Sequence, residues 1–528
     1  MNLATWLVDR HVAEGHGART AIVCEERRVS YAELQGLVNH AGNALAALGV
    51  KPEQRVALLL PDIPEFIATF LGAAKLGAVA VPVNTLLRAE ELAYILNHSR
   101  ARVLVAHEGL VGEVRKARPG LPFLRHLLVV GRPGAGEADL GEALARASAA
   151  LEPVPTEPDD AVLWAYSSGS TGAPKAAVHS HANLQVASRL FADEVLKIAP
   201  DDRSLATPKL FFTFGLGVNM YVPLRAASTV ILNPRPPAAE AVLGLIHRER
   251  PTLFYAVPTH YIRMLQVPDA ARRFDLSSIR LCFAGGEPLA PDVFRRWREA
   301  FGLEVLEFLG SSEALFLYLA NRPGEARPGS VGRPLPDYAL RLADAEGRDV
   351  PPGEPGILAL QGPTLFHHYA RRPDLTRRAF RGEWFLTGDQ FRQDAEGYYW
   401  FLGRTDDMLR VAGAWVAPAE VEGVLMEHPA VLECAVVGAR DADGTTRPRA
   451  CVVPRPGAAG DDALRAALIA FARERLAAYK VPRWVEFIPE LPKTVTGKTQ
   501  RFRLRAGHAP APPAEEGAGV RSTTPFSP

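Results

Sequence analysis

The sequence predicts an α/β protein with a large N-terminal domain, built of layered α/β subdomains and a β-rich subdomain, and a small C-terminal α+β domain. Two observations predict this class. Short apolar runs alternate with helical patterns through most of the chain, and a separate mixed pattern closes it. The length agrees, because 528 residues exceed what one compact core accommodates.

A strand–helix–strand unit opens the N-terminal domain. Residues 55–60 and 79–83 are short apolar runs typical of buried strands, and residues 64–76 between them carry an amphipathic helical pattern. A helical crossover of this kind joins parallel strands, so we expect a parallel sheet. The same alternation returns later, with strands expected at 229–232, 252–257, 279–284 and 305–308, and helices at 238–248 and after Pro291.

The stretch Tyr166–Lys175 combines hydroxyls, glycines and a cation between an apolar run at 161–165 and a helical pattern at 182–196. We therefore expect a strand-to-helix loop. Its glycines let backbone N–H groups point at an anion, and its hydroxyls and lysine add donors and charge. The interpretation is a polyphosphate site, against the alternative of a flexible Ser/Gly connector. It is not the G-x-x-x-x-G-K-[ST] loop, because Ala176 follows the lysine. The predicted contacts are Ser167, Ser168, Gly169, Ser170, Thr171, Gly172 and Lys175.

The last part of the chain predicts a change of architecture. Residues 356–402 are turn-rich, which indicates the β-rich subdomain and an end of the larger domain, 1–402. A compact α+β pattern follows, which predicts a second domain over 407–506. The tail, 507–528, is rich in Ala, Pro and Gly without an apolar period, so we expect it to be disordered.

Composition excludes several classes of protein. Lys+Arg 60 against Asp+Glu 59 gives a formal net charge of +1, so no basic footprint indicates nucleic acid or an anionic membrane. The most apolar window, 63–83, is interrupted by Glu65, Lys75 and Pro82, which argues against a membrane span. No C-x-x-C spacing occurs, so neither a disulfide framework nor a zinc site is expected from Cys24, Cys282, Cys434 and Cys451.

Residues 1–12 mix acidic and basic side chains and lack the apolar segment of a secretory signal. Together with the scattered cysteines, this predicts a cytoplasmic protein. The sequence leaves the oligomeric state open, and a homodimer is compatible with it.

Five motifs follow one another in a recognisable order: Tyr166–Lys175, Gly310–Glu313, Thr387–Asp389, Gly403–Asp407 and Pro492–Lys498. Their order and spacing resemble the adenylate-forming acyl-CoA synthetases, over nearly the whole chain. Four further segments look most like benzoate-CoA ligases: Lys209–Gly217, Gly310–Leu315, Asn321–Gly324 and Asp407–Val411.

The resemblance implies two half-reactions on a small-molecule carboxylic acid, here an aromatic one. The carboxylate attacks the α-phosphate of ATP and releases pyrophosphate, and the thiol of coenzyme A then captures the acyl-adenylate and releases AMP. The implied cofactors are ATP, Mg²⁺ and coenzyme A.

The same resemblance implies roles around the nucleotide. Glu313, beside Ser312, suits a catalytic Mg²⁺ ligand because a hard carboxylate after a strand end can face bound phosphates. Asp389 and Arg404 suit the ribose hydroxyls, the first as a two-oxygen acceptor and the second as a donor. The family's adenine-lining segment is matched in this sequence by Gly285, Gly286 and Glu287. Each motif alone also occurs as an ordinary turn or helix start.

Three further roles follow for the end of the chain. Lys498 is expected to stabilise charge on the α-phosphate during attack, whereas Lys493 is expected to be structural. Residues 403–406 with Asp406 match the family's hinge, about which the small, mobile domain turns between the half-reactions. Gly413 is then expected to border the pantetheine tunnel.

The predicted acid pocket is flat and apolar. It comprises Phe212, Thr213, Phe214, Gly215, Gly310, Phe316 and Leu317. Benzoate-CoA ligases typically carry Tyr at Phe214, His at Phe316 and Gly at Ala176, so this chain predicts a different or more apolar ring substituent than theirs. Ordinary core packing is the alternative for these aromatic positions.

Two other functions remain open at this point. One is an adenylating enzyme that loads an acyl group on the phosphopantetheine of a carrier protein. The other is a catalytically silent nucleotide-binding scaffold, against which the joint presence of Glu313, Asp389 and Lys498 argues.

Overall fold

The computed structural model describes residues 2–167, 173–344, 346–411, 414–441, 444–493 and 499–506. The chain divides into two compact units; the first runs to Thr405 and the second begins at Asp406. The tail predicted to be disordered, 507–528, lies outside the described residues. The architecture is mixed α/β, as the sequence predicts.

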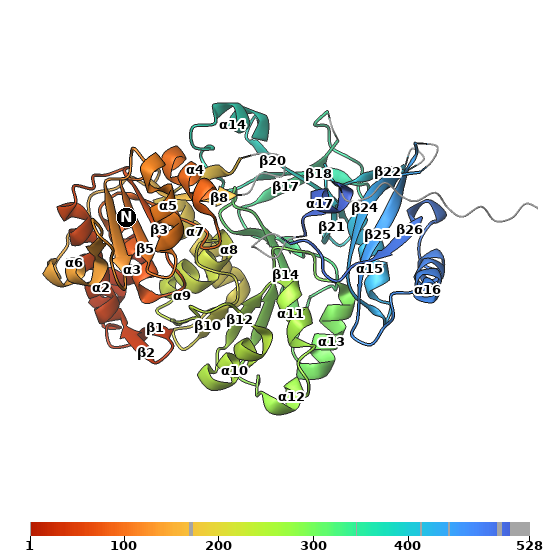
Figure 1. Ribbon diagram of the computed structural model, residues 1–528, viewed down its shortest axis with the longest axis horizontal. Helices are drawn as coiled ribbons and strands as arrows, with labels where there is room; N and C mark the ends of the chain where they lie inside the picture. The colour runs from red at the N-terminus through yellow and green to blue at the C-terminus, as the bar shows by residue number, and fades with distance from the viewer. Residues whose placement is uncertain are drawn as a thin grey trace, which may run out of the picture. The chain divides into compact units, whose positions relative to one another are not determined.

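One sheet of the first unit contains the predicted strand–helix–strand repeat (Figure 1). β3 pairs with β4 in parallel, and α3 (Pro64–Lys75) connects them, beginning with a proline whose missing N–H costs nothing at a helix start. In spatial order the strands of this sheet are β7 (Ala138–Asp139), β6 (His126–Val130), β5 (Val103–His107), β3 (Arg55–Leu59), β4 (Val79–Pro82), β8 (Ala161–Ser167) and β9 (Lys175–Ser180).

The edge of this sheet corrects one prediction. The Tyr166–Lys175 stretch is not a strand-to-helix loop, because β8 and β9 are antiparallel partners with Ser167 opposite Lys175. The helix α7 (His181–Arg189) begins only after β9. The local signal for β9 is weak, because two alanines follow its lysine and β-strands favour branched and aromatic side chains.

A nine-stranded sheet forms the other half of the core. Its six central strands are all parallel, and the strands expected from the alternating pattern are present. In spatial order they are β16 (Arg333–Pro334), β15 (Leu317–Ala320), β14 (Val305–Gly310), β13 (Leu281–Ala284), β12 (Leu253–Ala256), β10 (Arg203–Ala206), β11 (Thr229–Leu232), β1 (Thr20–Cys24) and β2 (Arg27–Ser30).

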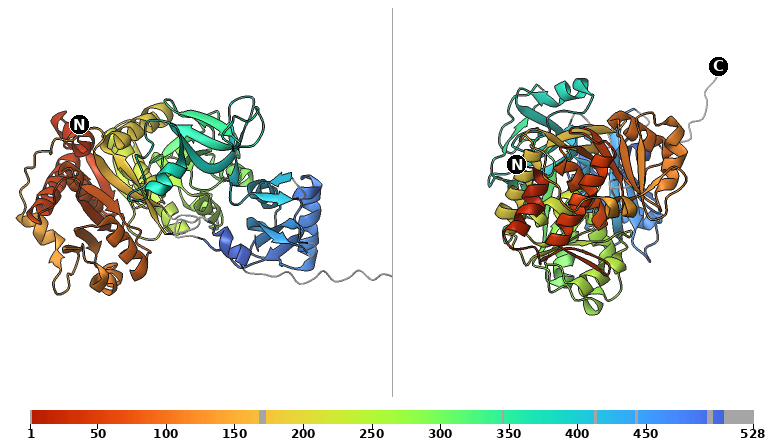
Figure 2. Two further views of the ribbon diagram at one scale, coloured as in Figure 1. Left: turned by 90° about the horizontal axis from the view of Figure 1, so that it is seen from above. Right: turned by 90° about the vertical axis from the view of Figure 1, so that its left-hand side faces the viewer.

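Helices α2 (Tyr31–Ala47) and α3 pack against each other, and Figure 2 shows these red helices side by side. Helix α2 starts with a capping box in which Ser30 and Glu33 satisfy each other's backbone N–H. The other helices of this unit up to residue 301 are α1 (Arg10–Ala13), α4 (Ala89–Ser99), α5 (Val111–Ala117), α6 (Leu140–Arg146), α8 (Thr213–Leu216), α9 (Val222–Arg225), α10 (Ala239–Glu249), α11 (Pro258–Met264), α12 (Ala270–Arg273) and α13 (Pro291–Phe301).

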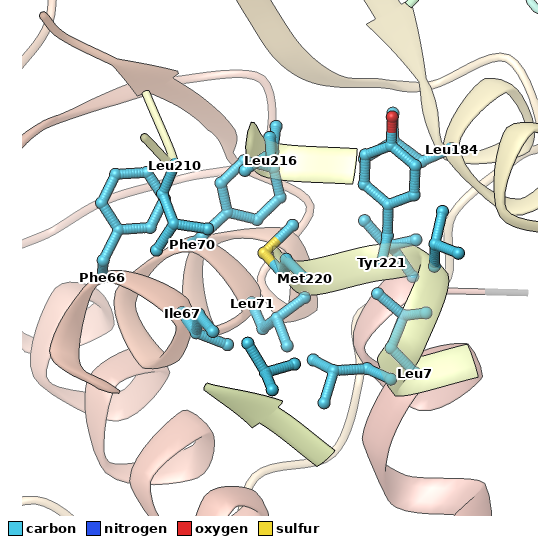
Figure 3. Close-up of a cluster of buried hydrophobic side chains, with 14 of the residues drawn as sticks. Leu7, Phe66, Ile67, Phe70, Leu71, Leu184, Leu210, Leu216, Met220 and Tyr221 are labelled. Atoms are coloured by element: carbon cyan, nitrogen blue, oxygen red, sulfur yellow. The ribbon is translucent and has the colours of Figure 1, made fainter. Parts of the chain in front are cut away.

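The largest hydrophobic core contains buried side chains from both sheets together with α2 and α3. In Figure 3, Phe66 and Phe70 of α3 lie near Leu210 and Leu216, and Met220 lies among them. Tyr221 follows in the same helical turn, Gly217–Tyr221 (η4), and its hydroxyl points away from Leu7 (Figure 3). This core therefore joins the 210–221 segment rigidly to both sheets.

The β-rich subdomain begins earlier than residue 356, because β17 is its first strand. Its five strands are β17 (Ala339–Ala343), β18 (Gly356–Gln361), β19 (Phe380–Arg381), β20 (Trp384–Gln393) and β21 (Tyr399–Arg404), and α14 (Pro373–Ala379) precedes β19. It packs around a core of its own that includes Tyr369, Phe391 and Tyr399.

The second unit has the predicted α+β pattern. A hairpin comes first, followed by a three-stranded sheet with helices. The elements are β22 (Leu409–Val411), β23 (Ala414–Val416), α15 (Pro418–Met426), β24 (Val431–Arg440), β25 (Thr446–Pro454), α16 (Asp462–Arg473), β26 (Trp484–Phe487) and α17 (Arg501–Ala506).

Two predicted absences can be compared with the described part of the chain. None of its helices is long and apolar enough to cross a membrane. All four cysteines are buried and carry free thiols.

Candidate active site

The predicted phosphate loop connects β8 and β9, the last two strands at one edge of the seven-stranded sheet. Ser167 ends β8 and Lys175 begins β9, whereas Ser168, Gly169, Ser170, Thr171 and Gly172 lie outside the described residues. Both ends of the loop are held from α4.

On one side, the hydroxyl of Tyr94 donates to the carbonyl oxygen of Pro174 at 3.0 Å. On the other, Nδ1 of His98 lies 2.7 Å from the hydroxyl of Tyr166. Contacts with α4 therefore hold the chain on both sides of the loop, and they fix the backbone position from which the Lys175 side chain extends.

Lys175, Tyr369 and Glu313 meet at the start of β9, where the loop ends. The Lys175 Nζ donates to the Tyr369 hydroxyl at 2.6 Å and lies 2.9 Å from Oε1 of Glu313. The Tyr369 hydroxyl donates to the same Oε1 at 2.8 Å. Three groups that are 56 or more residues apart in the sequence thus form one closed contact, which we call the Lys175–Tyr369–Glu313 triangle.

The carboxyl group of Glu313 is held ionised in this triangle. Burial opposes ionisation, but the charge of Lys175 and the hydrogen bonds from Lys175 and Tyr369 outweigh it and lower the pKa of Glu313. The lysine side chain is 27% exposed, so it retains access to solvent and to an incoming anion. The triangle therefore offers one cation and one carboxylate to a ligand at the loop.

A tight turn after β14 presents Ser312 and Glu313. Gly310 must be a glycine, because an added Cβ would lie 1.8 Å from the carbonyl oxygen of Phe316. Nε2 of the buried His179, on β9, lies 2.7 Å from the carbonyl oxygen of Ser312. Burial lowers the pKa of His179 to about 4, so the ring is neutral at pH 7.

Asp389 and Arg404 face each other across β20 and β21, where they are register partners. The Arg404 Nε lies 3.0 Å from Oδ1 of Asp389, and the Arg404 side chain is about half exposed. A carboxylate beside an available guanidinium presents both an acceptor and a donor, which suits a vicinal diol.

Gly285, Gly286 and Glu287 follow β13 directly, as the sequence predicts. A Cβ on Gly285 would come within 2.6 Å of the Phe308 ring, and Gly286 has a φ of +88°. Oε2 of Glu287 accepts a hydrogen bond from Thr259 at 3.1 Å. The small residues at this strand end thus allow an aromatic ring to lie against the backbone.

Phe214 and Phe316, two residues of the predicted acid pocket, are brought together by a third phenylalanine. The Phe308 ring lies 4.9 Å from Phe214 in an edge-to-face arrangement and 5.9 Å from Phe316, measured between centroids. Phe191 packs on both Phe308 and Phe316 at 6.0 and 5.2 Å. We call Phe191, Phe214, Phe283, Phe308 and Phe316 the aromatic cluster.

The other predicted pocket residues lie on neighbouring segments of the chain. Leu317 is buried at the start of β15, and Phe212 and Thr213 are half-buried at the start of α8. Gly215 allows the backbone of α8 to lie close to the backbone of Lys209, because a Cβ at residue 215 would lie 2.1 Å from the Lys209 carbonyl oxygen. The Lys209 side chain anchors the segment by donating to the Asn233 carbonyl oxygen at 2.5 Å.

Asp406, the predicted hinge residue, is the first residue of the second unit, and its carbonyl oxygen accepts a hydrogen bond from Arg505 at 3.4 Å. Lys498 and Gly413 lie outside the described residues.

The two described residues that flank the Lys498 segment pair with each other. Lys493 and Thr499 form an antiparallel bridge, and the Lys493 Nζ donates to Oε1 of Glu433 at 2.6 Å. Lys493 is therefore paired within the fold, in agreement with its predicted structural role.

Family models match both units of the chain. Residues 9–370 match the AMP-binding enzyme model, and residues 420–498 match the AMP-binding enzyme C-terminal domain. The chain belongs to the AMP-binding enzyme family. Tyr166–Lys175 and Gly310–Glu313 lie within the first of these matches, and Pro492–Lys498 lies within the second.

Several characterised members of the AMP-binding family are similar over nearly their whole length. A benzoate–CoA ligase of Thauera aromatica is 42% identical, with 96% of each chain covered. A 4-hydroxybenzoate–CoA/benzoate–CoA ligase of Rhodopseudomonas palustris is 39% identical, with 96% of this chain and 94% of the relative covered. The crystal structure of an anthranilate CoA ligase in complex with anthranoyl-AMP superposes with a TM-score of 0.92 at 39% identity, with 96% of each chain covered.

Three residues of the site were not predicted from sequence. Each of them contacts a predicted site residue that is more than fifty positions away in the sequence: Tyr369 contacts Glu313, Phe308 contacts Phe214 and His179 contacts Ser312. Only Phe308 carried a local signal, because it stands two residues before Gly310 on a strand already assigned to the site.

Proposed function

We propose that the chain is an AMP-forming ligase that couples an aromatic carboxylic acid to coenzyme A. The observation that carries this proposal is the Lys175–Tyr369–Glu313 triangle at the base of the phosphate loop. An ionised carboxylate and an ammonium side by side suit a magnesium nucleotide, in a chain that is 42% identical to a benzoate–CoA ligase.

In the first half-reaction, a carboxylate oxygen of the acid attacks the α-phosphorus of ATP. The new O–P bond forms as the bond to the bridging oxygen of pyrophosphate breaks, which leaves an acyl-adenylate. We assign the β- and γ-phosphates to Lys175 and to the hydroxyls and backbone N–H groups of the loop, namely Ser167, Ser168, Gly169, Ser170, Thr171 and Gly172.

The residues present fit Mg²⁺. No group of three His, Cys, Asp or Glu side chains that could cage a metal occurs among the described residues, and Mg²⁺ is commonly held by one or two carboxylates together with phosphates and water. Glu313, buried and ionised, would hold it. The ion, when bound, offsets charge on the phosphates.

The other polar residues orient the nucleotide. Asp389 accepts from the ribose hydroxyls and Arg404 donates to them, while Gly285, Gly286 and Glu287, with Ser312, border the adenosine. Lys498 offsets the negative charge that builds on the α-phosphate during attack. Each of these roles is a proposal that rests on the family and on the local geometry.

In the second half-reaction, the sulfur of coenzyme A attacks the carbonyl carbon of the adenylate. The C–S bond forms, the C–O bond to AMP breaks, and the thiol proton passes to solvent. We propose that the second unit turns about Asp406 between the two steps, so that Lys498 serves the first and Gly413 borders the pantetheine in the second.

The acid is proposed to bind at the aromatic cluster. Phe214 is the one partly exposed ring of the cluster and is proposed to face a flat aryl group, with Phe212, Thr213, Gly215, Gly310 and Leu317 proposed to line the same pocket. Because phenylalanine offers no hydrogen bond to a ring substituent, aryl acids with an apolar substituent should be preferred over hydroxybenzoates.

We also propose a cytoplasmic location, where ATP and coenzyme A are available and buried thiols such as those of this chain stay reduced. A homodimer remains a prediction, which light scattering of the purified protein would check.

The proposal is tested with the purified full chain, ATP, Mg²⁺ and a panel of aryl and medium-chain acids. We expect acid-dependent exchange of pyrophosphate into ATP, AMP release and an aryl-CoA thioester detected by mass spectrometry. A Glu313→Gln protein is the matched control.

Two outcomes would favour the other functions. Adenylate formation without a CoA thioester, but with loading of a carrier protein, would identify a carrier-loading enzyme. Calorimetric ATP binding without pyrophosphate release for any acid would identify a silent nucleotide-binding protein, and either result would overturn the proposal.

A further inference from the structure

We propose that Tyr369 is a positioning residue that holds the Glu313 carboxylate in the orientation needed to receive nucleotide-bound Mg²⁺. The inference rests on the proposed function, because it assigns Glu313 to the metal. It adds a residue that none of the five motifs contains.

The backbone fixes Tyr369 against β9, the strand that also carries Lys175. Residues 177 and 369 form an antiparallel bridge, and the N–H of Ala370 donates to the carbonyl oxygen of Ala176 at 2.8 Å. Two residues earlier, the N–H of His367 donates to the Val178 carbonyl oxygen at 3.0 Å. This ladder gives the tyrosine ring little freedom to move relative to Lys175.

The carboxylate is fixed by the same segment. The N–H of Phe366 donates to the carbonyl oxygen of Glu313 at 2.7 Å, so the backbone of the metal residue is tied three positions before Tyr369. The Tyr369 side chain itself is almost fully buried, at 3% exposure, within the hydrophobic core of the β-rich subdomain. A hydroxyl in such surroundings needs its partners, and it has them in Lys175 and Glu313.

The hydroxyl plays two different parts in the triangle. It accepts a hydrogen bond from the ammonium of Lys175 and donates one to Oε1 of Glu313. When Lys175 turns to the phosphates of a bound nucleotide, it gives up its own contact with Oε1. The donation from Tyr369 remains, keeps Oε1 occupied and leaves Oε2 to face the metal.

The test compares Tyr369→Phe with Tyr399→Phe in the full chain. Both tyrosines lie in the same hydrophobic cluster and are 3% and 2% exposed, so the control removes a buried hydroxyl that has no assigned part in the site. Binding of ATP is measured by calorimetry at several Mg²⁺ concentrations, without acid or coenzyme A.

For Tyr369→Phe we expect ATP to bind about 10- to 100-fold more weakly at low Mg²⁺, as loss of a hydrogen bond to a charged group predicts, with the difference closing as Mg²⁺ saturates. The KM for the acid should not change.

The dependence on Glu313 is tested by a double-mutant cycle. In a Glu313→Gln background, Tyr369→Phe should no longer weaken ATP binding, because the oriented carboxylate is already gone. If Tyr369→Phe does not fold, Tyr369→Met, an adaptable apolar residue without a donor, replaces it in every measurement.

Unchanged Mg²⁺-dependent ATP binding in Tyr369→Phe, or equal weakening in Tyr399→Phe, would overturn the proposal and leave the hydroxyl a packing element. So would a Tyr369→Phe effect that persists in the Glu313→Gln background. Failure of the proposed function is distinguishable, because it would appear as absent acid-dependent turnover in the unmodified protein while the ATP-binding measurements still decide the role of Tyr369.

Discussion

The Lys175–Tyr369–Glu313 triangle and the aromatic cluster lie in the same compact unit but are stabilised in opposite ways. Each polar atom of the triangle has one or two directional partners at 2.6 to 2.9 Å. The rings of the cluster instead overlap with several neighbours each, without directional bonds. A substitution in the triangle should therefore abolish a chemical role at little cost in stability, whereas one in the cluster should cost stability and change selectivity.

The largest effect is expected from Glu313→Gln. It keeps the shape but removes the charge that would hold Mg²⁺, so acid-dependent pyrophosphate exchange should fall on the order of 1,000-fold. The melting temperature should change little, because Lys175 is partly exposed and can be solvated. Glu299→Gln, on the exposed side of α13, is the matched control. Exchange at the unmodified rate would remove Glu313 from the metal site.

Lys498→Ala should come next. Adenylation should fall several hundredfold, because a positive charge on the α-phosphate is lost, while thioester formation from a synthetic acyl-adenylate should be much less affected. Lys493→Ala, which removes a nearby lysine that is already paired with Glu433, is the control. Equal loss in both half-reactions would contradict the assigned role.

Phe308→Ala tests the other side of the comparison. Deleting this ring should destabilise the protein by about 3 kcal/mol in chemical denaturation, because the neighbouring rings are held by the sheet and collapse only partly. The vacated space should also raise the relative kcat/KM for larger aryl acids. A normal stability with unchanged acid selectivity would show that Phe308 neither packs the cluster nor borders the acid.

The smallest effect on activity is expected from Glu307→Gln, at the strand residue beside Phe308, which should instead change how stability depends on pH. Burial raises the pKa of Glu307 to about 8, so the folded protein keeps a proton that the unfolded chain loses above its usual pKa of 4.5. Stability from this group is complete at low pH and is lost as pH rises towards 8, by up to about 1.4 kcal/mol per pH unit.

The variant has no such proton, so its stability relative to the unmodified protein should increase from pH 5 to pH 8 in denaturant titrations. A constant difference across this range would mean that Glu307 is already ionised in the folded protein.

The strands and helices with strong periodicity could be predicted from sequence, because the βαβ pattern around α3 and the apolar runs that became β11 to β14 carry local signals. The second strand of the phosphate hairpin could not, since Lys175–Ser180 has two alanines and a polar end. Sheet pairing supplied what local propensity lacked.

The residues of the candidate site also differ in how much local sequence signal they carry. Glu313, Asp389 and Lys498 are predicted as site residues because they stand in short motifs, whereas Tyr369 and His179 carry no such signal and enter only through a contact with a distant residue. Phe308 was missed for a different reason: aromatic residues in buried strands are usually core, and only its packing on Phe214 and Gly285 links it to the pocket.

The most direct test of the central claim follows one oxygen atom. An aryl acid labelled with ¹⁸O on both carboxylate oxygens is incubated with the enzyme, ATP, Mg²⁺ and coenzyme A, and the nucleotide product is analysed by mass spectrometry. If the carboxylate attacks the α-phosphorus and the thiol then displaces AMP, each AMP carries one ¹⁸O and no ADP forms. Unlabelled AMP, or ADP together with labelled orthophosphate, would contradict an acyl-adenylate intermediate.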